Sequence, residues 1–165
     1  MEGALYDSGP WQARLVSKPV TIRDADLKDR DNVWSLARDF ATSFELDRAC
    51  FDTSFDMLLT RPDTLFIVAH TPRDGLVGYL LAFSHTTFLA NGPVAWVEEI
   101  MVAEQVRRTG VGRNLMEAAD RWSSSAGAAY LALATRRAAS FYRALGYEES
   151  AIFFRKTNQE PARSR

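Results

Sequence analysis

The sequence predicts an α/β fold in which helices cover both faces of a central mixed, mostly antiparallel sheet, as a three-layer α-β-α sandwich. Apolar runs of strand length follow one another in the middle of the chain, and two longer stretches have apolar residues at every third or fourth position. Toward the C-terminus strands and helices alternate, which indicates parallel pairing. The 165 residues suit one domain. We expect it over residues 19–157, with loosely held termini at 1–18 and 158–165.

The N-terminal part predicts one strand and two helices. Residues 20–23 form a β-branched run typical of a strand, and Asp24 and Asp26 can cap a following helix. A second, weaker helix is expected over residues 52–59, ending before Pro62 because the residue before a proline avoids the helical region. The apolar face of the first helix is formed by Val33, Trp34, Ala37, Phe40, Ala41 and Phe44.

The middle of the chain predicts three antiparallel strands. Residues 65–69 and 77–83 are apolar runs, and the Pro-Arg-Asp-Gly sequence at 72–75 has the chemistry of a tight turn between them. A second turn at 91–93 leads into a long strand over residues 94–102. We therefore expect a meander.

The C-terminal part predicts helices alternating with strands. Residues 131–134 read as a buried strand, 138–145 as a short helix that stops at Gly146, and 151–156 as a last strand. The complete order is β-α-α-β-β-β-α-β-α-β, with parallel pairing after the third helix. The third helix begins at Gly110, and its apolar residues are Val111, Leu115, Ala118, Ala119, Trp122 and Ala126.

Composition argues against several classes of partner. The net charge is −1 and the sequence pI is about 6.1, so no basic field would attract nucleic acid. No apolar run approaches the roughly 20 residues that span a bilayer, and the acidic, mixed first residues do not resemble a signal peptide. With one cysteine, Cys50, and two histidines, His70 and His85, we expect no metal site. We expect a cytoplasmic protein in which Cys50 is a partly buried apolar side chain.

The most informative segment is residues 107–112, Arg-Arg-Thr-Gly-Val-Gly, where the third helix begins. The first amide groups of a helix have no intrahelical partner, and the helix dipole favours an anion beside them. Gly110 and Gly112 permit positive φ and let a phosphate approach the backbone. Arg107 and Arg108 add positive charge. The segment therefore predicts a phosphate-binding site.

Two common nucleotide motifs do not fit this segment. A P-loop needs Gly-Lys-Ser/Thr, but Gly112 is followed by Arg113 and Asn114. A dinucleotide fingerprint needs a third glycine where the chain has Leu115. A nucleotide-binding module is thus disfavoured, and it would predict that ATP competes for the loop. By themselves the two glycines would also suit a flexible turn that enters a helix.

The flanking residues resemble a known family. Residues 97–102, then 103–106, then 107–112 are similar to the acetyl-CoA loop of the GNAT acyltransferases, Arg/Gln-x-x-Gly-x-Gly/Ala after the fourth strand. Residues 138–147, Ala-Ala-Ser-Phe-Tyr-Arg-Ala-Leu-Gly-Tyr, resemble the family's second motif, Ala-x-x-Phe-Tyr-x-x-x-Gly-Phe/Tyr. With the order of elements, the resemblance extends over residues 20–156.

The resemblance implies a GNAT-like fold and an acetyl-CoA-dependent N-acetyltransferase. Such an enzyme moves an acetyl group to a primary amine of a small molecule or peptide by direct attack, with acetyl-CoA as co-substrate and no metal. A homodimer is compatible with it, since family members are often dimers. The alternative is a catalytically idle sensor that binds acyl-CoA through the same loop.

The resemblance also implies which residues contact the cofactor. Backbone groups of the fourth strand would pair with the pantetheine arm, and the amide of Met101 or Val102 would donate to the thioester oxygen. Two departures from the family pattern occur: Thr135 stands where many members have asparagine, and Ala103 is followed by Glu104 without the frequent proline. The implied cofactor-binding residues are Ile100, Met101, Val102, Arg107, Arg108, Thr109, Gly110, Val111, Gly112, Arg113, Thr135, Ser140 and Tyr142.

Two residues are the implied catalytic groups. Tyr142 occupies the family's position for the general acid, although it could simply pack beside Phe141. Glu98 matches the position of the base in polyamine-acetylating relatives. Its neighbour Glu99 or a water could serve instead, and both glutamates could be ordinary solvated charges. Adjacent residues on a strand face opposite sides, so we expect at most one of the two to face the cleft.

Acidic residues gather near the first two helices, which shape the acceptor site in this family. They could attract a cationic acceptor, or they could form a solvated acidic face. The phenylalanines among them could line a pocket or pack in the core. The acidic residues are Glu45, Asp47, Asp52 and Asp56.

Overall fold

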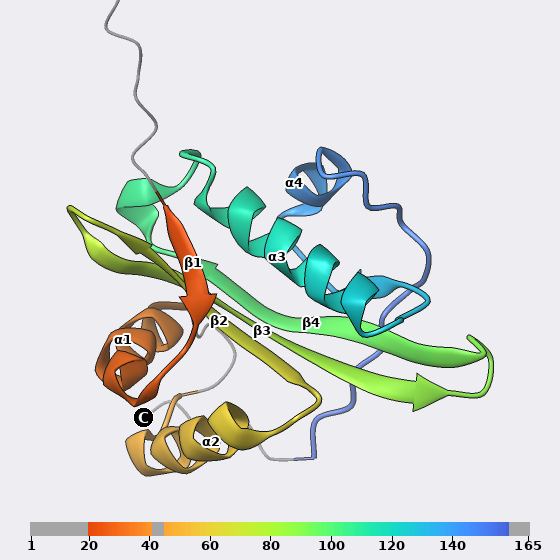
Figure 1. Cartoon of the computed structure of the whole chain (residues 1–165), viewed down its shortest axis with the longest axis horizontal. Helices are drawn as coiled ribbons and strands as arrows, with labels where there is room; N and C mark the ends of the chain where they lie inside the picture. The colour runs from red at the N-terminus through yellow and green to blue at the C-terminus, as the bar shows by residue number, and fades with distance from the viewer. Residues whose placement is uncertain (1–19, 41–44, 159–165) are drawn as a thin grey trace, which may run out of the picture.

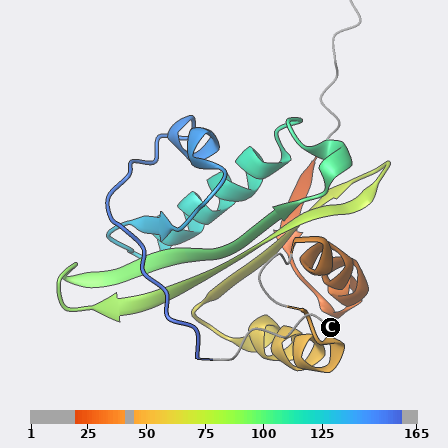
Figure 2. The same cartoon turned by 180° about the vertical axis from the view of Figure 1, so that it is seen from behind.

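The computed structural model describes residues 20–40 and 45–158 of the chain. Helices α1 (Arg30–Phe40) and α2 (Arg48–Thr60) lie on one face of the sheet, and α3 (Val111–Ser125) and α4 (Ala139–Arg143) lie on the other (Figures 1 and 2). Short 3₁₀ turns span Leu27–Asp29 (η1) and Glu104–Val106 (η2). The strands are β1 (Thr21–Asp24), β2 (Thr64–Thr71), β3 (Gly75–Thr87), β4 (Gly92–Val102) and β5 (Leu131–Leu133).

The sheet is mixed and mostly antiparallel, as the sequence predicts. Its strands lie in the order β1-β2-β3-β4-β5. The first three neighbouring pairs are antiparallel. Turns of a few residues join β2 to β3 and β3 to β4, whereas η1, α1 and α2 lie between β1 and β2. The crossover through α3 makes β5 parallel to β4. The meander and the later switch to parallel pairing are thus confirmed.

Alternate residues of β3 face opposite helical layers. A Cβ built on Gly78 would lie 3.4 Å from Leu115 and 3.5 Å from Val111, so this position faces α3. Tyr79, the next residue, therefore faces α1 and α2. On that side the ring of Phe55 in α2 contacts the ring of Phe66 in β2, with centroids 5.2 Å apart. The core thus lies on both faces of the sheet.

A buried acidic residue anchors the start of the first helical segment. Asp29 is 4% exposed and accepts hydrogen bonds from both terminal nitrogens of Arg23, at 2.6 and 2.7 Å. It also accepts the backbone N–H of Asp26, whose own side chain caps η1. Burial alone would raise the pKa of Asp29, but these hydrogen bonds and the Arg23 charge outweigh it and lower the pKa. The predicted cap at Asp26 is confirmed.

Several predicted boundaries shift. Helix α2 begins at Arg48, earlier than expected, because the Asp47 side chain accepts the backbone N–H of Cys50 at 2.8 Å. Cys50 is exposed, which corrects the expectation of partial burial. In the first helix, Ala41 and Phe44 lie outside the described residues, as do the expected terminal segments apart from Asn158. Helix α4 and strand β5 are shorter than predicted.

The predicted last strand over residues 151–156 is wrong. This segment has no strand assignment, and the side chains of Ile152, Phe153 and Phe154 are exposed. After α4 the chain crosses to the α2 side of the sheet (Figures 1 and 2), where the ring of Phe153 stacks on Trp96 with centroids 6.3 Å apart. The segment thus packs across the sheet and extends no edge of it.

Candidate active site

A β-bulge interrupts β4 in the middle of the predicted site. Leu81 of β3 lies opposite Glu99, and the next residue, Ala82, lies opposite Val97. Glu98 is therefore the extra residue and has no partner on β3. Since a bulge breaks the alternation of faces, Glu98 and Glu99 are not forced to opposite sides of the sheet. The expectation that only one of them can face the cleft loses its basis.

The same point of β4 is where its pairing with β5 stops. The parallel ladder runs from Ala95↔Leu131 to Val97↔Leu133 and goes no further. From Glu98 to Val102, the edge of β4 that points away from β3 pairs with no strand among the described residues. Its backbone N–H and C=O groups can therefore pair with an extended ligand, as an added strand would.

Glu99 is held by a buried tyrosine. The hydroxyl of Tyr79, a residue only 2% exposed, donates to Oε2 of Glu99 at 2.7 Å. Burial raises the pKa of Glu99, the Tyr79 hydrogen bond lowers it, and the charge of Glu98 raises it again, with a net rise. Burial and the Glu99 charge also raise the pKa of Tyr79, so its hydroxyl keeps its proton. Glu98 itself is exposed.

The loop between β4 and α3 is tied back to the strand. The side-chain Nε of Arg107 donates to the carbonyl of Val102 at 3.1 Å, and the Thr109 hydroxyl donates to the carbonyl of Val106 at 2.6 Å. Two residues of this loop have left-handed backbone, Arg108 with φ 64° and Gly110 with φ 96°. These bonds fix the loop at the end of the open edge of β4.

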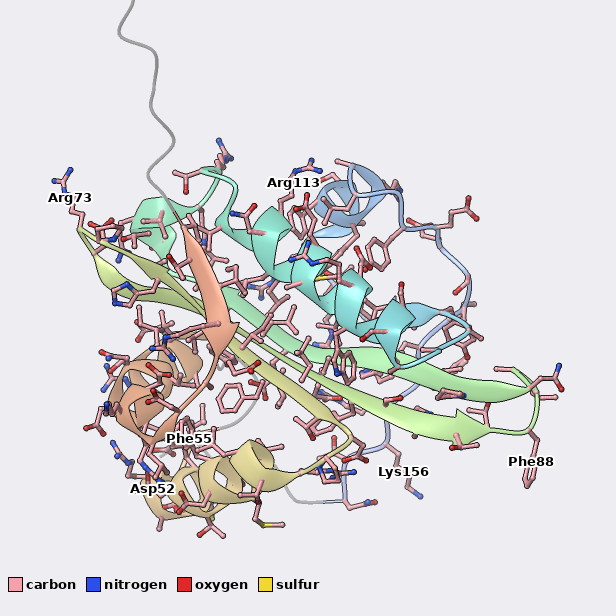
Figure 3. All side chains as sticks on the ribbon, viewed as in Figure 1. Asp52, Phe55, Arg73, Phe88, Arg113 and Lys156 are labelled. Carbon is pink, nitrogen blue, oxygen red and sulfur yellow. The ribbon has the colours of Figure 1, made fainter. Side chains whose placement is uncertain are left out.

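Helix α3 begins at Val111, with Gly110 as its N-cap. The amide of Asn114 makes the first helical bond, to the Gly110 carbonyl at 3.0 Å. The amides of the preceding three residues therefore lie before the first intrahelical bond. A Cβ on Gly110 would meet no atom within 4 Å, and the exposed Arg113 projects from the first turn (Figure 3). The cationic, open helix start fits a pyrophosphate.

Gly112 has a different role from the one predicted. It has no positive φ, and a Cβ there would lie 3.3 Å from Cζ of Phe141. The missing side chain therefore makes room for α4 and not for a phosphate. The contact also places α4, which carries Tyr142, against the start of α3.

Tyr142 combines a buried ring with an available hydroxyl. The residue is 8% exposed, and its ring contacts Phe141 and Tyr147 at centroid distances of 5.0 and 6.0 Å. Its hydroxyl has no hydrogen-bond partner among the described residues, yet it is not one of their fully buried unpaired atoms. Burial raises the pKa of Tyr142, so the proton stays on the oxygen at neutral pH. The packing alternative holds for the ring and leaves the hydroxyl free.

Some of the other predicted contact residues already make hydrogen bonds within the protein or have buried side chains. The Thr135 hydroxyl accepts the amides of Arg137 at 3.4 Å and Ala138 at 3.1 Å, which caps the turn before α4. It retains its own hydrogen for a ligand. Ser140 is exposed on α4, whereas the side chains of Val111 and Met101 are buried, so only their backbone groups can reach a ligand.

The acidic residues near α1 and α2 are largely paired. Arg30 bonds to Asp52 and Asp56, and Arg48 bonds to Asp52 and Asp31. Hydrogen bonds from Arg48 and Arg30 lower the pKa of Asp52. The Asp47 side chain caps α2, so among the four predicted acidic residues only Glu45 takes part in none of these contacts. The arrangement favours a solvated ion-pair network over a site that attracts cations.

Sequence reasoning missed Tyr79 and the contact between Phe141 and Gly112. The sequence predicts the strand that contains Tyr79 from its apolar residues alone, and the bond from Tyr79 to Glu99 depends on the bulged register. Two cavities, of about 430 and 290 Å³, lie beside α2 and do not include the bulge or the loop. Within the described part of the chain, no group of three His, Cys, Asp or Glu residues could hold a metal, and no helix could cross a membrane.

Comparison with known proteins identifies the family. The sequence profile described as "Acetyltransferase (GNAT) domain" matches residues 62–149, more than half of the chain. Among curated proteins, none matches this sequence. Glucosamine-6-phosphate N-acetyltransferase from Arabidopsis thaliana has 18% identity and a TM-score of 0.76, with 86% of this chain and 100% of that one covered.

Two further solved structures share the fold. A transcriptional regulator from Bacillus halodurans C-125 has 21% identity and a TM-score of 0.77, with 84% of this chain and 99% of that one covered. An aminoglycoside acetyltransferase from an uncultured soil metagenomic sample has 18% identity and a TM-score of 0.69, with 85% of this chain and 97% of that one covered. At these identities the likeness concerns the fold. Because the GNAT profile spans most of the sheet, the loop and α4, the chain belongs to the GNAT family of acetyltransferases.

Proposed function

We propose that this protein is an acetyl-CoA-dependent N-acetyltransferase that acetylates a primary amine of a small molecule or peptide. The strongest support is that the open edge of β4 and the loop before α3 adjoin each other. The open edge of β4, from Glu98 to Val102, leads directly into the loop whose left-handed Gly110 exposes the first amides of α3. A long ligand with an extended arm and a pyrophosphate would use both.

Different residues would bind different parts of acetyl-CoA. Backbone groups of Ile100, Met101 and Val102 bind the extended arm, and the amides at the start of α3 bind the phosphates. Arg107, Arg108 and Arg113 are exposed and add positive charge there. Thr135 and Ser140 bind from the α4 side. Acetyl-CoA supplies the activated acyl group as a thioester.

Proton transfer needs a donor and an acceptor. The free hydroxyl of Tyr142 donates a proton to the leaving sulfur, since its raised pKa keeps it protonated at neutral pH. A carboxylate at the bulge, Glu98 or Glu99, takes the proton of the amine. An amide of Met101 or Val102 donates a hydrogen bond to the thioester oxygen.

A thiol-release assay across a panel of primary amines tests the proposal. The panel begins with amino sugars, because two of the similar structures are acetyltransferases named for glucosamine-6-phosphate and for aminoglycosides. We expect release that requires both acetyl-CoA and amine, together with calorimetric binding of acetyl-CoA. Binding without release across the whole panel would contradict the proposal and favour the idle acyl-CoA sensor. Competition by ATP for the loop would favour a nucleotide-binding module.

A further inference from the structure

We propose that Glu99 is the residue that accepts the proton of the acceptor amine, and that Tyr79 is the positioning residue that fixes its carboxylate. This inference rests on the proposed acetyl transfer and deepens it. Glu98, which the family resemblance favours as the base, would then act on Glu99 through its charge.

Contacts of the two carboxylates distinguish them. Oε2 of Glu99 accepts the Tyr79 hydroxyl at 2.7 Å, and Oε1 has no hydrogen-bond partner among the described residues. The carboxylate thus has one fixed oxygen and one free oxygen. Glu98 is exposed and has no hydrogen bond to another described residue that would orient it. A base held in one geometry loses less entropy in reaching its substrate.

Position along β4 also favours Glu99. It lies directly before Ile100, at the first residue after the bulge, on the stretch whose outer edge is open. Its partner Tyr79 stands opposite Met101, the residue whose amide is a proposed donor to the thioester oxygen. Glu99 and the oxyanion donor are therefore held by the same paired segment of β3 and β4.

The surroundings of Glu99 suit a proton acceptor for an amine. Partial burial and the charge of Glu98 raise the pKa of Glu99. The pKa is then closer to neutral pH, and the carboxylate is a stronger base. Tyr79 on β3 and Glu98 on β4 are the titratable groups that act on it. Helix α1, which packs on this face, buries the apolar Val33 and Leu36, while its Arg30 pairs with α2.

The step is a simple proton transfer. The N–H bond of the ammonium breaks, and an O–H bond forms at Oε1 of Glu99, which leaves a neutral amine and a neutral carboxyl. The nitrogen lone pair is then free to attack the acetyl carbon. As the C–S bond breaks, the sulfur takes the Tyr142 proton, and the second proton of the attacking nitrogen restores the Tyr142 hydroxyl. Glu99 returns its proton to water, so both groups are regenerated without any further reactant.

Opposite shifts in the pH profile of kcat/KM provide the test. Tyr79→Phe removes a hydrogen bond that lowers the pKa of Glu99, so the acid limb should move to higher pH. Glu98→Gln removes a charge that raises this pKa, so the limb should move to lower pH. Glu99→Gln, which keeps the shape and can still accept from Tyr79, should lower kcat/KM by roughly 10²- to 10⁴-fold.

A second readout does not depend on turnover. In protein labelled with ¹³C at glutamate side chains, the carboxyl resonance of Glu99 should titrate above the ordinary pKa of 4.5 and follow the same two shifts in the variants. Full kcat/KM in Glu99→Gln, or a Glu99 carboxyl that titrates at its ordinary value, would overturn the inference. Either result could occur in an active enzyme. An inactive wild type that still binds acetyl-CoA would instead defeat the proposed function on which the inference rests.

Discussion

Replacing Gly78 by alanine tests how closely β3 and β4 approach beside the proposed thioester site. A Cβ at this position would lie 2.7 Å from the carbonyl oxygen of Met101, closer than the 3.0 Å that real Cβ contacts essentially never undercut. The obstacle is backbone, so no rotamer change can relieve it. One strand must move by a few tenths of an ångström, which in a packed interior costs about 1–3 kcal/mol.

Thermal unfolding measures that cost. For a chain of this length, a loss of about 2 kcal/mol lowers Tm by about 4–8 °C. The matched control is Gly92→Ala, also in a strand, where an added Cβ meets no atom within 4 Å. We expect the control to change stability by less than about 0.5 kcal/mol. Because Gly78→Ala displaces Met101, it should also weaken acetyl-CoA binding. Equal Tm values for the two variants would contradict the close approach of Gly78 to the carbonyl oxygen of Met101.

Three further predictions concern single side chains. Tyr142→Phe should slow turnover about 10²-fold or more while calorimetry shows little change in acetyl-CoA affinity, and full activity would contradict its role as acid. Asp29→Asn should cost about 2 kcal/mol in a urea titration at neutral pH. Since the folded-state pKa of Asp29 is lowered, this difference should shrink as the pH falls below 3.8, and a constant difference would contradict the ion pair. Arg108→Gly should relieve left-handed strain of about 1–2 kcal/mol, partly offset by chain entropy, and yet weaken acetyl-CoA binding in a salt-dependent way. Lower stability in this variant would contradict the backbone strain at Arg108.

Local chemistry explains what the sequence predicted well. The turn at residues 72–75 depends on a few neighbouring residues, and so does the left-handed backbone of Gly146, with φ 90°, although α4 itself ends earlier, at Arg143. The loop around Gly110 is likewise a local feature, since its conformation follows from the start of α3. Such features can be read without knowing what packs against them.

Register and long-range pairing explain what the sequence did not predict. The bond between Tyr79 and Glu99 joins residues 20 positions apart and depends on one extra residue in β4. The ion pair of Arg30 with Asp56 spans 26 positions, so the sequence alone could not decide between a cation-attracting site and a solvated acidic face. Residues 151–156 have a strand-like pattern, but a strand also needs a neighbouring edge, and their path crosses the sheet instead.

Backbone amide NMR during a titration with coenzyme A tests the central claim most directly. The claim is that one continuous surface, from the open edge of β4 to the start of α3, binds the cofactor. The account predicts that the largest shifts fall on Met101, Val102, Gly110, Gly112 and Arg113. Shifts concentrated beside α2, at the residues around its two cavities, with the loop unperturbed, would contradict it.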